Sequence, residues 1–212
     1  MAITAPAEPH AAWRLARFLH HRLVSHRRNS ALAAILADLV PPGATALDIG
    51  CGSGAVGYLL QRIKPTLSIR GLEVQPRPSC LIECGSFDGA RIPLGDDSVD
   101  VCMFVDVLHH TENIVELLKE ARRVARRYVL VKDHLCENRW DRALLSFMDR
   151  VGNPPRGVRM ADNYKNRAEW DRIFASSGLR IARWNDRLLL FPPVFNPLFG
   201  RGLHYVGLFE RC

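Results

Sequence analysis

The feature that most constrains this chain is an apolar segment that runs directly into a glycine-rich turn. Residues 45–49 read as a buried β-strand, residues 50–54 read Gly-Cys-Gly-Ser-Gly, and a helical stretch follows at 54–63. Glycines in such a turn let a ligand approach the backbone closely, while the first turn of the helix offers unpaired N–H groups. This strand, turn and helix therefore predict a cofactor-binding site.

The remainder of the chain alternates short apolar runs with helical stretches, which is typical of βαβ units and a mostly parallel sheet. Asn166, with Glu169 three positions later, predicts the start of a helix that Gly178 ends. The other expected helices lie near 54–63, 112–125 and 139–151, and the expected strands near 45–49, 69–74, 80–84, 99–105, 127–132, 179–184 and 204–210.

The 212 residues are enough for one hydrophobic core, so we expect one domain with additions. Residues 1–40 are predicted to form a basic helical cap, and residues 41–212 the main domain, with an insertion at about 135–165. In the cap, one helix is expected over 11–28 and a second is expected to begin after Ser30. The first of these carries five arginines, Arg14, Arg17, Arg22, Arg27 and Arg28.

The charge balance is basic, with 29 Lys and Arg against 22 Asp and Glu, a net charge of +7. This excess indicates an anionic partner, a solvated helix face or only the base composition of a genome. No apolar run approaches the roughly 20 residues of a membrane span, so we expect a cytoplasmic protein. The 6 cysteines are expected to be reduced thiols, and because Cys80 and Cys84 have no second pair of ligands, no metal site is predicted.

The glycine turn alone leaves the cofactor open, because residues 52–57 also satisfy the G-x-G-x-x-G pattern of dinucleotide-binding proteins. Asp48 argues against a nucleotide, since a carboxylate there would repel a pyrophosphate but suits a ligand that carries ammonium and sulfonium charges. Glu73, at the end of the second expected strand, is placed to accept hydrogen bonds from ribose hydroxyls in either case.

Three further blocks follow in order. Residues 87–94 read Phe-Asp-Gly-Ala-Arg-Ile-Pro-Leu, Ser-Val-Asp follows at 98–100, and residues 106–110 read Asp-Val-Leu-His-His. Together with the Asp-x-Gly-x-Gly-x-Gly turn at 48–54 and Glu73, the chain resembles the class I S-adenosylmethionine-dependent methyltransferases, in particular their small-molecule branch. The resemblance spans about residues 40–211.

The resemblance implies a Rossmann-like α/β fold with a seven-stranded, mostly parallel sheet in the order 3-2-1-4-5-7-6, strand 7 antiparallel and helices on both faces. It also implies S-adenosylmethionine as cofactor, with Asp88 at the adenine amino group and Phe87 beside the base. The cofactor-binding residues that it indicates are Asp48, Gly50, Cys51, Gly52, Gly54, Glu73, Val74, Phe87, Asp88 and Asp106.

Methyl transfer needs few catalytic residues, because alignment of nucleophile and methyl group contributes much of the acceleration. The candidates for a base are His110 and His109, with Asp133 or His134 after the fifth strand. The expected acceptor is a small molecule, with an anionic one as an option, and the oligomeric state stays open. Alternatives are an RNA methyltransferase that uses the basic helix, a non-catalytic cofactor-binding module and, last, a nicotinamide dehydrogenase.

Overall fold

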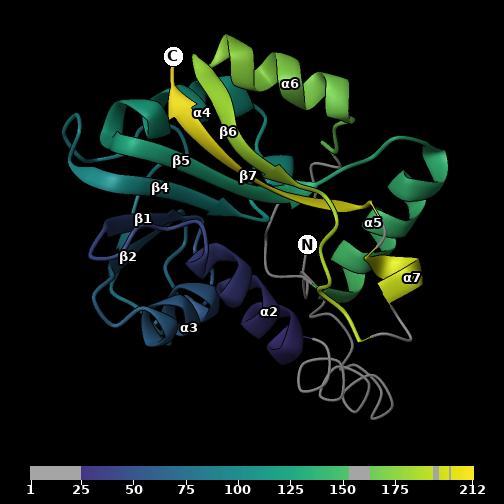
Figure 1. Cartoon of the computed structure of the whole chain (residues 1–212), viewed down its shortest axis with the longest axis horizontal. Helices are drawn as coiled ribbons and strands as arrows, with labels where there is room; N and C mark the ends of the chain where they lie inside the picture. The colour runs from purple at the N-terminus through teal and green to yellow at the C-terminus, as the bar shows by residue number, and fades with distance from the viewer. Residues whose placement is uncertain (1–24, 153–162, 193–195, 201) are drawn as a thin grey trace, which may run out of the picture.

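The computed structural model describes residues 25–152, 163–192, 196–200 and 202–212, and within them a single seven-stranded sheet forms the centre of the molecule (Figure 1). Its strand order is β3-β2-β1-β4-β5-β7-β6. β7 runs antiparallel to both β5 and β6, and the other pairs are parallel. The predicted order and the antiparallel seventh strand are confirmed. The strands are β1 (Thr45–Ile49), β2 (Ser68–Glu73), β3 (Cys84–Ser86), β4 (Val99–Val105), β5 (Ala125–His134), β6 (Leu179–Asn185) and β7 (His204–Arg211).

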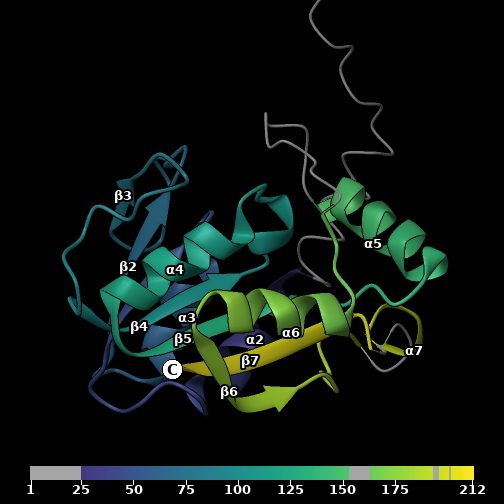
Figure 2. The same cartoon turned by 90° about the horizontal axis from the view of Figure 1, so that it is seen from above.

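Helices cover both faces of the sheet. α4 (Ile114–Val124) and α6 (Arg167–Ser176) lie on one face, and α2 (His26–Ala37) and α3 (Ala55–Ile63) lie on the other (Figure 1). α5 (Arg139–Gly152) and the short α7 (Asn196–Phe199) sit together beyond the end of β5, as the view from above also shows (Figure 2). The carboxyl ends of β4 and β5 therefore face this pair of helices.

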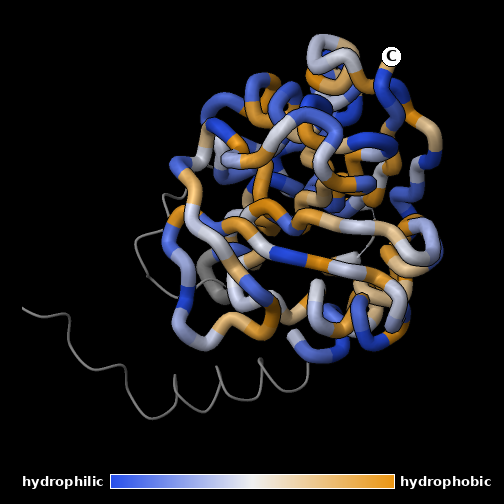
Figure 3. Tube along the Cα trace, turned by 90° about the vertical axis from the view of Figure 1, so that its left-hand side faces the viewer, coloured by the Kyte–Doolittle hydropathy of each residue, from blue (hydrophilic) through white to orange (hydrophobic). Residues whose placement is uncertain are grey.

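Two apolar layers hold the helices to the sheet. On the side of α4 and α6, the fully buried Trp170 and Phe174 stack at 5.4 Å between ring centroids, and both contact Tyr205 of β7. On the other side, Leu36 of α2 and Leu60 of α3 belong to one buried cluster with strand residues. Figure 3 shows the interior strands as largely hydrophobic and the turns between them as largely hydrophilic. Burial of both strand faces explains the nearly continuous apolar runs of β4 and β5.

Two predicted elements differ from the structure near the cofactor turn. The strand predicted at 80–84 is wrong, because β3 covers only Cys84–Ser86. Residues 80–82 instead pack against the glycine turn, where Leu81 N–H donates to the carbonyl of Ser53 at 2.9 Å. The chain therefore reaches β3 only after it has passed the turn.

The predicted helix start at Ser30 is also wrong, since α2 begins at His26 and runs through that position. Burial of Leu32 and Leu36 against the sheet outweighs the capping preference of serine. Most of the helix predicted over 11–28 lies outside the described residues. The division into a cap and a main domain at residue 40 stays a prediction.

The segment between β3 and β4, which carries the predicted adenine-binding residues, is held by one side chain of α4. The Arg123 guanidinium donates to the carbonyl oxygens of Ile92 and Leu94 at 3.1 and 2.9 Å. It also pairs with the carboxylates of Asp96 and Glu120, each at 2.8 Å. Hydrogen bonds to a charged group are stronger than neutral ones, so this arginine fixes the segment on α4.

We expect Arg123→Ala to lower the free energy of unfolding by about 2 kcal/mol, because two loop carbonyls lose a charged donor. Lys119→Ala on the same helix removes one exposed pair with Glu116 and should change it by less than about 0.5 kcal/mol. Urea denaturation of both variants checks this difference. Equal losses would mean that Arg123 does not fix the segment.

Candidate active site

The glycine turn after β1 combines left-handed backbone with close packing on two sides. Gly50 and Gly54 have φ of 73° and 70°. A Cβ on Gly50 would lie 2.6 Å from a Val107 methyl group, and one on Gly54 would lie 2.8 Å from Ile82. A Cβ on Gly52 would meet no atom within 4 Å. The turn is thus packed on both flanks and open at Gly52, where a ligand can approach the backbone.

Asp48 lies beneath this turn and is 2% exposed. Among the residues that the structure describes, its Oδ1 has no hydrogen-bond partner. Burial and the nearby Glu73 raise the pKa of Asp48 to about 7. An isolated buried carboxyl group is unfavourable unless a donor or a cation satisfies it, so this residue provides an acceptor for a positively charged ligand.

Glu73, at the end of β2, is tied to the same turn. Its Oε2 accepts the N–H of Gly52 at 2.8 Å, and its Oε1 accepts the N–H of Val74 at 3.0 Å. Carboxylate oxygens have several acceptor positions, so these two bonds leave room for ribose hydroxyls. Val74 is exposed beside it. The two residues lie together at the open end of the turn.

Phe87 and Asp88 follow β3 directly. The Phe87 ring is partly buried against the main core cluster. The Asp88 side chain is exposed, and its Oδ1 accepts the N–H groups of Ala90 and Arg91, each at 2.8 Å. These bonds lower the pKa of Asp88. Its carboxylate is therefore ionised and fixed by its own turn.

Cys51 belongs to the turn but faces the sheet. Its Sγ lies 3.5 Å from Cys84 Sγ, and a Cβ on Gly71 would lie 2.4 Å from it. Burial raises the pKa of the Cys51 thiol, which disfavours the thiolate. All six cysteines are free thiols, as predicted. Only the backbone of Cys51 is available to a ligand at the turn.

Asp106 directly follows β4 and lies in the left-handed region, with φ of 57°. Its carboxylate forms ion pairs with Lys132 of β5 and with Arg28 of α2. Burial favours the neutral carboxyl group, but these two cations hold the pKa of Asp106 well below its usual value. The side chain of Asp106 thus joins β4, β5 and α2 at the carboxyl edge of the sheet.

His109 is completely enclosed between two carboxyl groups. Its Nδ1 lies 2.7 Å from Asp133 Oδ1, and its Nε2 lies 3.5 Å from Asp149 Oδ2. Burial lowers the pKa of His109, but Asp133 and Asp149 outweigh this effect and raise it to about 10. A histidine with that pKa is protonated near pH 7 and makes a poor general base.

His110 has the opposite character. It is half-buried, and no described residue forms a hydrogen bond with its Nδ1. Burial and the neighbouring His109 lower the pKa of His110. Of the two histidines predicted as catalytic, His110 is therefore the one that can accept a proton near pH 7.

The second predicted pair, Asp133 and His134, lies in the same buried cluster at the end of β5. Asp133 Oδ2 accepts the N–H of Leu108 at 2.9 Å, which fixes the turn that carries His109. His134 Nδ1 lies 3.0 Å from His204 Nδ1 of β7, and its carbonyl accepts the indole N–H of Trp170 at 2.9 Å. Both residues therefore position their neighbours.

The sequence did not predict several members of this cluster as cofactor-binding or catalytic residues. Arg28, Lys132, Asp149, Tyr164 and His204 come from α2, β5, α5, the segment before α6 and β7. A usable signal existed at residues 132–134, because three ionisable residues directly follow the apolar run of β5. The others carried none, because only the fold brings them together.

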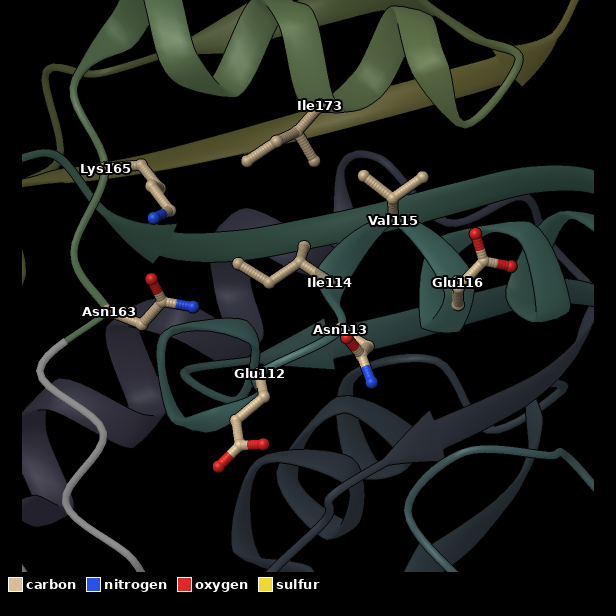
Figure 4. Close-up of a pocket in the computed structure, with 8 residues that line it drawn as sticks. All are labelled: Glu112, Asn113, Ile114, Val115, Glu116, Asn163, Lys165 and Ile173. Carbon is tan, nitrogen blue, oxygen red and sulfur yellow. The ribbon is translucent and has the colours of Figure 1, made fainter.

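A separate depression of about 320 Å³ lies between the start of α4 and α6 (Figure 4). In Figure 4, Asn163 and Lys165 lie at one end of it and Glu116 at the other. Asn163 Nδ2 donates to the carbonyl of Thr111 at 2.8 Å, which ties this wall to the outside of the His109 turn. None of the residues that line the depression is a predicted cofactor or catalytic residue.

Comparison with known proteins supports the resemblance. Residues 47–128 match a family model described as a methyltransferase domain. A protein from Streptomyces fradiae, described as an uncharacterized 37.1 kDa protein in transposon Tn4556, is 33% identical over 98 residues. That match covers 40% of this chain, and the chain spans only 28% of the length of that protein.

Solved structures share the fold. A SAM-dependent methyltransferase from Aquifex aeolicus superposes with a TM-score of 0.61 at 18% identity over 97% of this chain and 100% of that chain. A geranyl diphosphate methyltransferase in complex with GPP and sinefungin gives 0.63 at 14% identity, over 86% of this chain and 77% of that one. Residues 47–128 therefore match a methyltransferase domain, and the described part of the chain shares the fold of SAM-dependent methyltransferases. The predicted enzyme class and cofactor agree with these matches.

The raised pKa of Asp48 predicts how pH changes stability. Between its unfolded value of 3.8 and about 7, the folded state binds more protons, so stability relative to Asp48→Asn should fall as pH rises. The full effect is about 4 kcal/mol between pH 3 and pH 8. Urea denaturation of both proteins over this range measures it.

Asp100→Asn is the matched control, because backbone and hydroxyl donors of Thr45 and the Arg126 guanidinium lower the pKa of Asp100. Its sign is the reverse: the contribution of Asp100 is lost as pH falls below its unfolded value. A pH-independent difference for Asp48→Asn would show that Asp48 is ionised in the folded protein throughout the range.

Proposed function

We propose that this chain transfers a methyl group from S-adenosylmethionine to a small-molecule acceptor. The observation that supports this most directly is a buried Asp48 oxygen that has no hydrogen-bond partner in the described ranges, beneath a glycine turn that is open at Gly52. A ligand with a cationic amino-acid part satisfies that oxygen, whereas a pyrophosphate would be repelled by it.

Each remaining cofactor residue then has a role of its own. Glu73 accepts ribose hydroxyls, Val74 and Phe87 border the adenine, and Asp88 accepts the adenine amino group. Gly50, Gly52 and Gly54, with Cys51, offer backbone to the amino-acid part. Asp106 is held by Lys132 and Arg28, so we assign it to fixing the end of β4 beside the methyl group rather than to proton transfer.

The cofactor supplies a methyl carbon that is already activated by a sulfonium centre. The acceptor atom forms its bond to that carbon as the carbon–sulfur bond breaks, and the electron pair stays on sulfur. The chain orients the acceptor in line and excludes water. Where the acceptor atom carries a proton, we assign His110 as the base that takes it.

In this proposal the acceptor binds at the carboxyl ends of β4 and β5. The helices α2 and α5 lie beside it. The edge is rich in fixed charge, which suits a polar or anionic acceptor; the geranyl diphosphate enzyme of the same fold has an anionic small molecule in its name. Arg28 is already paired with Asp106 and is not free for phosphate. This favours a small molecule over RNA.

Location, nucleic-acid binding and the extent of the basic cap go beyond what the matches to known proteins support. No described helix is long and apolar enough to cross a membrane. A cytoplasmic location and the absence of nucleic-acid binding stay predictions, as does the boundary of the basic cap. A non-catalytic module would bind the cofactor equally well but transfer no methyl group to any acceptor.

Glu73→Ala should weaken S-adenosylhomocysteine binding by about 10- to 100-fold, because the ribose loses a charged acceptor. Isothermal titration calorimetry measures this loss. Glu73→Gln keeps an acceptor for the N–H of Gly52 and should lose less. Glu83→Ala, an exposed acid just before β3, is the control and should bind as the wild type does. No binding of S-adenosylhomocysteine by the folded wild type would refute the proposed cofactor.

His110→Ala should lower kcat by about 10²- to 10⁴-fold for an acceptor that carries a proton, with little change in S-adenosylhomocysteine affinity. Methyl transfer is measured as production of S-adenosylhomocysteine across a panel of hydroxyl, amine and carboxylate acceptors. If the variant lost S-adenosylhomocysteine affinity to the same extent as kcat, His110 would have a structural role and would not be the base. Transfer to RNA that steepens at low salt would favour the RNA alternative.

A further inference from the structure

Two histidines and one carboxylate converge in the buried cluster beside the glycine turn. One ligand-type atom from each of His109, His134 and Asp149 lies within 4.8 Å of the other two. The His109 Nε2 to Asp149 Oδ2 distance of 3.5 Å is close to the separation of about 3.4 Å between two tetrahedral ligands of zinc. The three residues come from the turn after β4, the end of β5 and α5.

The hydrogen-bond partner of His109 Nδ1 determines which ring nitrogen carries the hydrogen when the ring is neutral. Nδ1 faces the Asp133 carboxyl group at 2.7 Å, so in the neutral ring Nδ1 carries the hydrogen and Nε2 keeps its lone pair. His109 is 1% exposed, and within the described part of the chain its Nε2 has no hydrogen-bond partner; it faces Asp149 Oδ2 at 3.5 Å. Without a metal ion the ring is protonated between the two carboxyl groups, and a bound metal ion would take the place of the proton on Nε2.

The same reasoning applies to His134 through a longer chain of bonds. His204 Nε2 lies 3.0 Å from the carbonyl of Phe199, which only accepts, so His204 carries its hydrogen there. His204 Nδ1 is then an acceptor, which lies 3.0 Å from His134 Nδ1 and 3.3 Å from the Lys132 ammonium group. When His134 Nδ1 carries the ring hydrogen, Nε2 keeps its lone pair, and this nitrogen lies 3.6 Å from Asp106 Oδ1.

We propose that His109, His134 and Asp149 bind one divalent transition-metal ion, of which zinc is the representative. Two imidazoles and a carboxylate are ligands of zinc and iron(II) sites that keep positions open for substrate. Asp133 and His204 are the outer partners that fix the two rings, as outer-shell groups do in such sites. This proposal departs from the sequence-based prediction of no metal site.

The surroundings suit a cation. Tyr164 donates its hydroxyl hydrogen to Asp149 and stacks on His109 at 5.5 Å between ring centroids, so the third ligand is also held in place. The nearby cations Lys132 and Arg28 are both paired with Asp106, and Lys132 Nζ also lies 3.3 Å from His204 Nδ1. Asp133 and Asp149 remain to offset the charge of the metal ion.

The position of the metal site links it to the proposed function. The role of the metal ion in methyl transfer rests on that proposed function, whereas metal binding itself does not. Val107, two residues before His109, contacts the cofactor turn at Gly50. A hydroxyl, amine or carboxylate of the acceptor would complete the coordination. For a hydroxyl acceptor, a bound metal ion would lower the pKa of the O–H and His110 would take the proton; the oxygen would then bond to the methyl carbon as the carbon–sulfur bond breaks and its electron pair stays on sulfur.

Zinc binding by the full chain tests the site. After removal of bound metal, zinc titration and elemental analysis should give one equivalent per chain for the wild type. His109→Gln and Asp149→Asn should weaken binding at least about 100-fold, and Asp133→Asn by about 10- to 100-fold. His110→Gln, whose ring lies 3.9 Å from that of His109 but outside the triad, should bind as the wild type does.

A second cluster makes a thiol control necessary, because Cys51, Cys80 and Cys84 also lie within 4.8 Å of one another by their sulfur atoms. The double variant Cys80→Ser, Cys84→Ser should keep the zinc equivalent. Cobalt in the wild type should show no thiolate charge-transfer absorption. Loss of zinc in the double variant, or that absorption, would place the metal at the cysteines and overturn the proposal.

Two further results would overturn it: a folded wild type that retains no zinc, or triad variants that bind zinc as tightly as the wild type. A folded wild type without zinc would mean that His109 Nε2 carries a proton toward Asp149 instead of binding a metal ion. Circular dichroism and urea denaturation establish that each variant is folded. S-adenosylhomocysteine calorimetry on the same proteins is a separate readout, so loss of the metal site and failure of the proposed function are distinguished.

Discussion

The ion pair of Lys132 with Asp106 is the interaction on which the acceptor side of the structure depends. Lys132 is fully buried in β5, and burial lowers its pKa to about 8. A buried cation is strongly unfavourable without a partner, so Asp106 has to stay at its side. The left-handed conformation of Asp106 points the chain away from β4 at that place and starts the turn that carries both histidines. One charge compensation thus fixes where β4 ends and where the site begins.

The same pair explains why α2 lies where it does. Arg28 adds a second cation to Asp106, while Leu32 and Leu36, on the following turns, are fully buried against the sheet. A polar tether near one end of the helix and apolar packing along it together determine its direction. Such a buried network is costly unless every member is satisfied, and it defines a single arrangement when they are. The charged network at the carboxyl edge of the sheet therefore costs stability but holds its side chains in one defined arrangement.

The sequence predicts the cofactor side much better than the acceptor side, for a physical reason. The cofactor site is built by one local unit, β1, the glycine turn and α3, so glycine spacing and Asp48 are enough to reveal it. Strand order follows from the resemblance and is confirmed. The start of α2 is missed because tertiary burial of Leu32 outweighs the local capping preference of Ser30, and β3 is misplaced because residues 80–82 pack on the turn.

The acceptor side is assembled from side chains that are far apart in sequence, so no spacing rule finds it. His109 and Asp149 are separated by forty residues, and His204 lies further still, yet one buried cluster contains all three. The polar triplet at 132–134 is the one local clue, because an apolar strand seldom ends on three ionisable residues unless they meet partners. Val107 contacts the cofactor turn from this side. The Val107 side chain therefore places the histidine turn directly beside Gly50, so the acceptor side and the cofactor turn are packed against each other.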